Sequence, residues 1–93
     1  MLFLAQWTIR PEHRDRAIER FKQSGGPPPS SVKVIGRWHT IGQSGGLLFA
    51  EAKDSLVMGQ WCMGWSDIFS FDIKPVVDDD DLLKILDPAA HPS

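Results

Sequence analysis

The feature that most constrains the fold of this chain is a predicted β-hairpin near its middle. Residues 32–40, VKVIGRWHT, and residues 46–52, GLLFAEA, are rich in β-branched and large apolar side chains. The glycine-rich loop IGQSGG, residues 41–46, joins them. Two strand-like runs separated by such a loop are typical of neighbouring antiparallel strands. We expect this hairpin to form the middle of a β-sheet.

Side chains alternate between the two faces of a strand, so the hairpin can be divided into faces. In the first strand we expect Val34, Gly36 and Trp38 on one face, and Lys33, Ile35, Arg37 and His39 on the other. In the second strand, Leu47, Phe49 and Glu51 alternate with Leu48, Ala50 and Ala52. Because Trp38 and His39 alternate, only one of them can point into any one pocket.

A strand and a helix are predicted before the hairpin. Residues 2–9, LFLAQWTI, have the composition of a strand, and the apolar start of this run predicts burial on both faces. Pro11 is well suited to the first turn of a helix, which glycines 25 and 26 end. Ala17, Ile18 and Phe21 form its apolar stripe. The arginines of this helix are expected to face solvent.

A second helix and a last strand are predicted after the hairpin. Asp54 is an effective N-cap, and Val57, Trp61 and Trp65 then recur at four-residue steps. Residues 68–77 alternate like a strand, and Pro75 indicates an edge position. The aspartates 78–81 precede a short helix over residues 82–86 and are expected to cap it.

The predicted order is β-α-β-β-α-β plus a short C-terminal helix. This order indicates a ferredoxin-like α+β domain, a four-stranded antiparallel sheet with both main helices on one face. We expect one domain over residues 1–86 and a flexible C-terminal tail over residues 87–93. The other face of the sheet then needs a cover, so we expect a homodimer through the sheet face that forms an α/β barrel.

Composition and charge limit the partners and metal sites that we expect for this chain. The net charge of the 93 residues is −2, so we expect neither a nucleic-acid partner nor a membrane partner. The single Cys62 cannot form a disulfide within the chain, and we expect a cytoplasmic protein in which this thiol is a small apolar filler. The aspartate run does not match a calcium loop, and one cysteine with three scattered histidines does not fit a zinc site. We therefore expect no metal and no cofactor.

Aromatic residues provide the candidate site. Four Trp and five Phe are more than one small core can easily enclose, so some are expected to line an interface or a pocket. Arginine offers a rigid fork for a carboxylate, and histidine a donor or acceptor that changes with pH. The candidate ligand-binding residues are Trp7, Arg37, Trp38, His39, Glu51, Trp61 and Trp65, with Phe71 as a further wall. No catalytic motif is found.

Three motifs carry a resemblance to a known family. They are WTIRP at residues 7–11, GRWH at residues 36–39, and the pattern of Trp61 with Trp65-Ser66-Asp67. With them, roughly residues 1–86 resemble the DUF3303 family of unknown function. That family is similar in outline to the dimeric α/β-barrel superfamily, which includes cofactor-independent quinol monooxygenases and haem-degrading enzymes. The resemblance implies a fold and dimerisation, and it assigns no activity and no site residue.

Three functional hypotheses follow. The first is a binding protein for a small apolar or aromatic molecule, held by the candidate residues above. The alternative is a monooxygenase-like enzyme without a bound cofactor, in which His39 or His13 acts as the general base. The third is a dimer with a purely structural role. An enzyme should show a buried cavity in which His39 meets a dry polar partner, whereas a purely structural dimer should show tightly packed Trp residues and no cavity.

Overall fold

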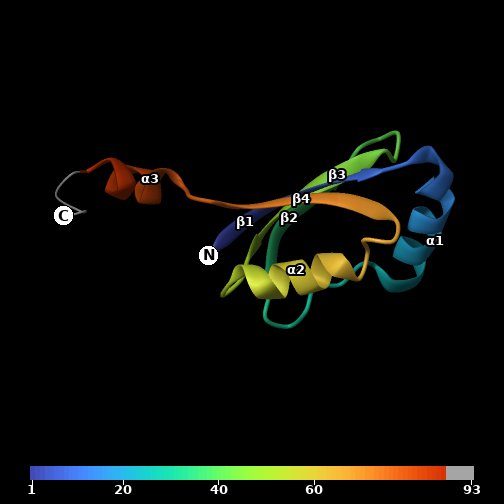
Figure 1. Ribbon diagram of the computed structural model, residues 1–93, viewed down its shortest axis with the longest axis horizontal. Coiled ribbons are helices and arrows are strands. Elements are labelled where there is room, and N and C mark those ends of the chain that lie inside the picture. The colour runs from blue at the N-terminus through green and yellow to red at the C-terminus, as the bar shows by residue number, and fades with distance from the viewer. Residues whose placement is uncertain (88–93) are drawn as a thin grey trace.

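The computed structural model of the protein describes residues 1–87 and confirms the predicted order of elements (Figure 1). A 3₁₀ turn, η1, opens the first helix, and the short C-terminal helix is present. In chain order the elements are β1 (Leu2–Ile9), η1 (Pro11–His13), α1 (Arg14–Ser24), β2 (Lys33–His39), β3 (Gly45–Glu51), α2 (Ser55–Met63), β4 (Phe69–Val76) and α3 (Asp79–Leu86). The predicted tail, residues 87–93, lies outside the described residues except for Asp87.

The four strands form one antiparallel sheet in the order β2-β3-β1-β4. In the central pair Leu4 lies opposite Phe49, and on the other side of β1 Ala5 lies opposite Ile73. The prediction that the whole hairpin forms the middle of the sheet was wrong for β2, which is an edge strand. The first strand of the chain, β1, lies between β3 and β4, so β3 is the only strand of the hairpin with neighbours on both sides. Pro75 lies on the other edge strand, as its missing N–H predicts.

A β-bulge changes which face the start of β2 presents. The register of β2 against β3 shifts between Val34 and Gly36, so Ile35 is the extra residue. Val34 lies opposite the buried Ala50, whereas Gly36 lies opposite Phe49 on the other face. The predicted grouping of Val34 with Gly36 and Trp38 was therefore wrong. The grouping of Arg37 with His39, opposite Trp38, is confirmed.

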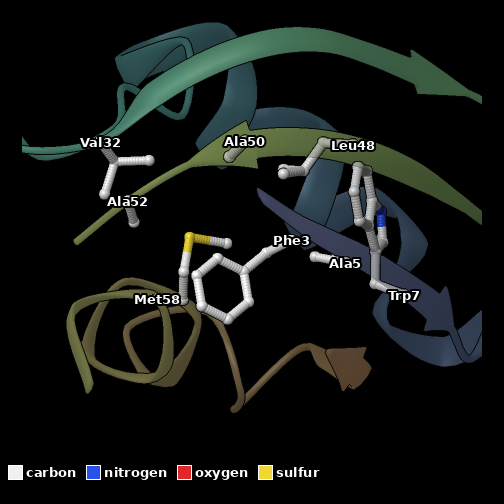
Figure 2. Close-up of a cluster of buried hydrophobic side chains, with 8 residues drawn as sticks. All are labelled: Phe3, Ala5, Trp7, Val32, Leu48, Ala50, Ala52 and Met58. Carbon is white, nitrogen blue, oxygen red and sulfur yellow. The ribbon is translucent and has the colours of Figure 1, made fainter. Parts of the chain in front are cut away.

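The hydrophobic core lies between the sheet and α2 (Figure 2). Along β1, Phe3, Ala5 and Trp7 point to this side and are at most 6% exposed. Figure 2 shows Met58 of α2 beside the ring of Phe3, and both side chains are fully buried. We call this side of the sheet the helix face.

The opposite side, the open face, is apolar as well but has no cover within residues 1–87. Leu2 and Leu4 of β1 and Leu47 and Phe49 of β3 are half-buried there, and Trp38 of β2 is 55% exposed. The register places all five on the same side of the sheet. The predicted burial of β1 is therefore found on the helix face, whereas Leu2 and Leu4 on the open face are only half-buried within residues 1–87.

Local signals in the sequence fix the helix ends. Gly25, with a φ of 72°, ends α1, and its N–H donates to the carbonyl oxygen of Phe21 at 2.7 Å. A carboxylate oxygen of Asp54 accepts from the N–H of Val57 at 3.1 Å, and Asp78 caps α3 in the same way. Helix α2 ends at Met63, so Trp65 lies in the turn that follows it rather than on the helix. No described helix is both long and apolar enough to cross a bilayer.

The packing of Trp7 gives a first prediction, for Gly46→Ala. A Cβ on Gly46 would lie 2.5 Å from Cζ2 of Trp7 and 2.5 Å from the carbonyl oxygen of Trp38. Since the backbone cannot move freely, we expect the free energy of unfolding in urea to fall by about 1–3 kcal/mol. Gly42→Ala is the matched control, because nothing lies within 4 Å of its Cβ position. Equal stability of the two variants would contradict this packing.

Candidate functional site

Five of the seven candidate residues meet at one cavity between the helix face and the two main helices. They are Trp7 of β1, Arg37 and His39 of β2, Trp61 of α2 and Trp65 of the following turn. The free volume of this inner cavity is about 50 Å³, and its walls are almost entirely apolar. The remaining wall residues are Phe21, Gly26, Leu48, Cys62, Phe69 and Phe71.

A row of stacked rings forms one wall of the inner cavity. Phe69 lies between Trp65 and Trp7, with ring centroids 5.2 Å and 5.9 Å away and interplanar angles of 16° and 18°. Phe71 meets Phe69 edge-on at 5.6 Å. Aromatic pairs in these arrangements pack favourably, so the wall is rigid. Alternation places Phe69 and Phe71 on the helix face, opposite Ile9 and Trp7.

A larger outer cleft adjoins the inner cavity. It has a volume of about 340 Å³ and shares Trp7, Phe21, His39 and Phe69 with the inner cavity. Its other walls come mainly from α1, β1 and the hairpin loop: Ile9, Ala17, Ile18, Lys22 and Gln43. The outer cleft alone is within the size range of roughly 300–1,000 Å³ that small-molecule sites occupy.

His39 lies where the inner cavity and the outer cleft meet. Its ring makes edge contacts with Trp7 at 5.8 Å and with Phe21 at 5.1 Å. Neither ring nitrogen has a hydrogen-bond partner among residues 1–87. The residue as a whole is exposed, but partial burial of its ring, and secondly the charge of Arg37, lower the pKa of His39 from its usual 6.5. The ring is therefore neutral at pH 7 and offers one donor and one acceptor to a ligand.

Arg37 is occupied by the backbone. Its two terminal nitrogens donate to the carbonyl oxygens of Gly26 at 2.7 Å and Gly25 at 2.9 Å, and its guanidinium lies 5.1 Å from the ring of Phe21. Burial lowers the pKa of Arg37. These contacts hold the loop after α1 against β2. The side chain thus serves as a wall of the cavity, and its fork is directed at the backbone rather than at a ligand carboxylate.

The structure does not bring Trp38 and Glu51 to this cavity. Trp38 lies on the open face, edge-on to Phe49 at 6.5 Å, and its ring covers the space that a Cβ on Gly36 would fill. Glu51 is exposed at the far end of β3, where it lines a groove together with Met1 and other residues. Both side chains lie across the sheet from His39, because period-two alternation separates them.

An ionic contact that the sequence did not predict lies beside the cavity. The guanidinium of Arg20 donates two hydrogen bonds to the carboxylate of Asp67, at 2.8 Å and 3.0 Å, and lies 5.3 Å from the ring of Trp65. Arg16 lies 3.4 Å from the same carboxylate. The hydrogen bonds from Arg20 lower the pKa of Asp67. This contact joins α1 to the turn that carries Trp65. Arginines one helical turn apart were a signal that could have indicated a shared acidic partner.

Cys62 supplies an apolar part of the wall. It is 6% exposed, and burial raises the pKa of its thiol to about 11. The thiol is therefore protonated at neutral pH and is a poor nucleophile. Within residues 1–87, no group of three or more His, Cys, Asp or Glu side chains is arranged to hold a metal ion.

The family model described as "Domain of unknown function (DUF3303)" matches residues 1–90. The chain belongs to the DUF3303 family. No curated protein matches this DUF3303 chain. Among solved structures, Rv0793 from Mycobacterium tuberculosis is similar over 84% of this chain and 95% of that chain, with 9% identity and a TM-score of 0.49. The chemistry of the DUF3303 cleft must therefore be argued from its own residues.

The position of His39 gives a prediction about pH. Because the pKa of His39 is lower in the folded state than in the unfolded state, the unfolded state takes up its proton first as the pH falls. The contribution of His39 to stability is thus present above pH 6.5 and is lost below it. We therefore compare the free energy of unfolding in urea at about pH 7.5 and at about pH 5. The decrease on going to the lower pH should be smaller in His39→Gln than in the unaltered protein.

The matched control is His13→Gln, because His13 lies outside the cleft on η1. The pH dependence of stability in His39→Gln should be weaker than in this control. An unchanged pH dependence in His39→Gln would contradict the position assigned to the ring.

Proposed function

We propose that the cleft binds a small, largely apolar or aromatic molecule that carries one hydrogen-bonding group. The observation that carries this proposal is the neutral ring of His39, which has no hydrogen-bond partner among residues 1–87 and lies at the junction of the inner cavity and the outer cleft. Ligand sites in proteins are mostly apolar with a few polar groups that fix orientation. The candidate residues that take part are Trp7, His39, Trp61 and Trp65, while Arg37 holds the wall.

The dimensions suggest how such a ligand lies. The inner cavity of about 50 Å³ has room for a methyl group or the edge of a ring, and the outer cleft of about 340 Å³ has room for the rest. A hydroxyl or carbonyl at the junction would meet the free nitrogen of His39. Lys22 at the outer wall is a cation that would favour a partly negative ligand oxygen.

A comparison of phenol with toluene tests this binding mode. The two probes differ by a hydroxyl in place of a methyl group, and His39→Phe removes the ring nitrogens while keeping an aromatic wall. We expect the affinity for phenol relative to toluene to fall by about 2–10-fold in His39→Phe, as for the loss of one hydrogen bond. Quenching of tryptophan fluorescence reports binding, since Trp7, Trp61 and Trp65 line the cavity.

His13→Phe is the control for this experiment and should leave the ratio unchanged. If neither probe quenches fluorescence in the unaltered protein, the cleft does not bind such molecules, and the purely structural role is favoured. If both probes bind and the ratio stays the same in His39→Phe, the role assigned to His39 is wrong.

A cofactor-independent monooxygenase is the second candidate, and the same histidine favours it. A neutral imidazole in an apolar cleft can accept the proton of a phenolic hydroxyl, which would leave an anion able to react with dioxygen. Oxygen consumption on addition of hydroquinone separates an enzyme from a binding protein. Loss of that consumption in His39→Phe would assign the general base.

We also propose that the chain forms a homodimer through the open face, as a single domain in a reducing, cytoplasmic compartment. Half-buried Leu2, Leu4, Leu47 and Phe49 with the exposed Trp38 form an apolar surface of the kind that proteins cover with a partner. Large aromatic side chains such as Trp38 are frequent anchors of interfaces. A dimer of this kind leaves the cleft free, because the cleft lies on the helix face.

Substitution on the open face tests the dimer. We expect Phe49→Asp to shift the protein from dimer to monomer in sedimentation equilibrium, because a carboxylate would be buried without a partner. Trp38→Glu should act in the same way, and its exposed position means that the monomer can tolerate it. Ile41→Asp, in the hairpin loop and 99% exposed, is the control and should remain a dimer. A dimeric Phe49→Asp would contradict the proposed interface.

A further inference from the structure

The polar side chains of the outer cleft can all donate hydrogen bonds, and none of them is a carboxylate. They are Lys22 of α1, His39 of β2 and Gln43 of the loop between β2 and β3. In the inner cavity the charged lining residue is Arg37, which is also a cation. Among residues 1–87, no Asp or Glu lines the cavity or the cleft. The lining therefore has positive charge and no negative charge to balance it.

The ammonium group of Lys22 is available to a ligand. Within residues 1–87 it makes neither an ion pair nor a hydrogen bond. Glu19, three residues earlier on α1, accepts a hydrogen bond from Nε2 of Gln23 at 3.3 Å. The carboxylate of Asp67, beside the cavity, is held by Arg20 at 2.8 Å. Lys22 can thus pair with an anion in the cleft without giving up a partner.

The second donor, Gln43, is held in an unfavourable backbone conformation. Its φ of 58° is positive, and within residues 1–87 glycines are the other residues with a positive φ. This conformation brings the Cβ of an L-residue too close to the backbone. The loop imposes it: the N–H of Gln43 donates to the carbonyl oxygen of Thr40 at 3.0 Å. The hydroxyl of Thr40 in turn accepts from the N–H groups of Ser44 and Gly45, at 3.0 Å and 3.2 Å.

A strained residue of this kind indicates a role for its side chain. Glycine would adopt the same φ without cost, and strained residues concentrate at sites that hold ligands. Gln43 is half-buried, lines the outer cleft, and its side-chain amide has no hydrogen-bond partner among residues 1–87. Figure 1 shows the loop between β2 and β3 at the same end of the molecule as α1. Gln43 and Lys22 therefore reach the same cleft from different elements.

We propose that the ligand of the cleft is an aromatic carboxylate, and that Lys22 and Gln43 bind its carboxylate group. A carboxylate offers only acceptors, whereas an ammonium group and an amide NH2 both donate. The ring of the ligand would lie against Trp7 and Phe69, which line both the inner cavity and the outer cleft. This inference rests on the proposed function and adds to it the charge class of the molecule.

Two probes of nearly the same shape test the charge: 4-hydroxybenzoate and 4-hydroxybenzamide. Both have the phenolic hydroxyl that the proposed function assigns to His39, and they differ in a carboxylate against a neutral amide. Their dissociation constants are measured at neutral pH from the shifts of the protein's amide signals in NMR titrations. We expect the carboxylate to bind at least ~5-fold more tightly, as for a charge-assisted hydrogen bond in place of a neutral one.

Lys22→Gln removes the ammonium group, and Lys33→Gln is the matched control because it changes the net charge equally. Lys33 is exposed at the start of β2, and His39 is the last residue of that strand. Lys22→Gln should reduce the preference for the carboxylate over the amide by about 3-fold or more, whereas Lys33→Gln should keep it.

Gln43→Gly tests the strained loop with two readouts. Because glycine adopts a positive φ without strain, this variant should unfold at a higher urea concentration than the unaltered protein. It should also bind 4-hydroxybenzoate about 2–10-fold more weakly, since one hydrogen bond is lost. A variant that binds this probe as tightly as the unaltered protein would overturn the role assigned to Gln43.

The outcomes separate this inference from the proposed function. A protein that binds phenol but shows no preference for the carboxylate over the amide overturns the inference and leaves the apolar-ligand proposal standing. A preference that Lys22→Gln leaves unchanged overturns the placement of the carboxylate at Lys22. A protein that binds neither phenol nor the two probes overturns both proposals.

Discussion

The packing of Trp7 is the contact on which both the core and the cleft depend. Its indole is 6% exposed, stacks near-parallel on Phe69 and meets the edge of His39. It fits only because Gly46, opposite it on β3, has no side chain. One residue thus closes the core, forms a cavity wall and positions the histidine ring. A change that displaces Trp7 would alter stability and the site together.

Because side chains alternate along the strands, the two faces of the sheet carry different sets of residues. The helix face carries the stacked rings, His39 and the core, whereas the open face carries Trp38, Phe49 and the leucines. The proposed ligand on one face and the proposed partner copy on the other would therefore use different side chains. The contact of Arg20 with Asp67 tethers α1 at the mouth of the cleft without entering it.

Most of the fold could be predicted from the sequence because each element carries its own local signal. Gly25 and Asp54 mark helix ends through backbone geometry and side-chain hydrogen bonds. The continuous apolar start of β1 indicates that both faces of this strand need a cover. The bulge at Ile35 could not be predicted from the sequence, since the position of an extra residue depends on pairing with the neighbouring strand rather than on composition. It reversed the face assigned to Val34.

The candidate site was predicted only in part, because the sequence does not show which residues meet in the folded chain. Alternation showed that His39 and Trp38 lie on opposite faces, but not which face the helices cover. The role of Arg37 depends on the carbonyl oxygens of Gly25 and Gly26, which only the fold brings within reach. Phe21 was assigned to the apolar stripe of a helix and residues 68–77 to a strand. That Phe21 and Phe69 line the same cavity is likewise a tertiary contact.

The central claim is that His39 is a free polar group at the junction of the inner cavity and the outer cleft. The most direct test is an NMR spectrum that correlates the ring nitrogens of the histidines with their ring protons, recorded during a titration with phenol. The account predicts that the His39 nitrogens shift as phenol binds and that those of His13 do not. A His39 signal that remains unchanged while phenol saturates the protein would contradict it.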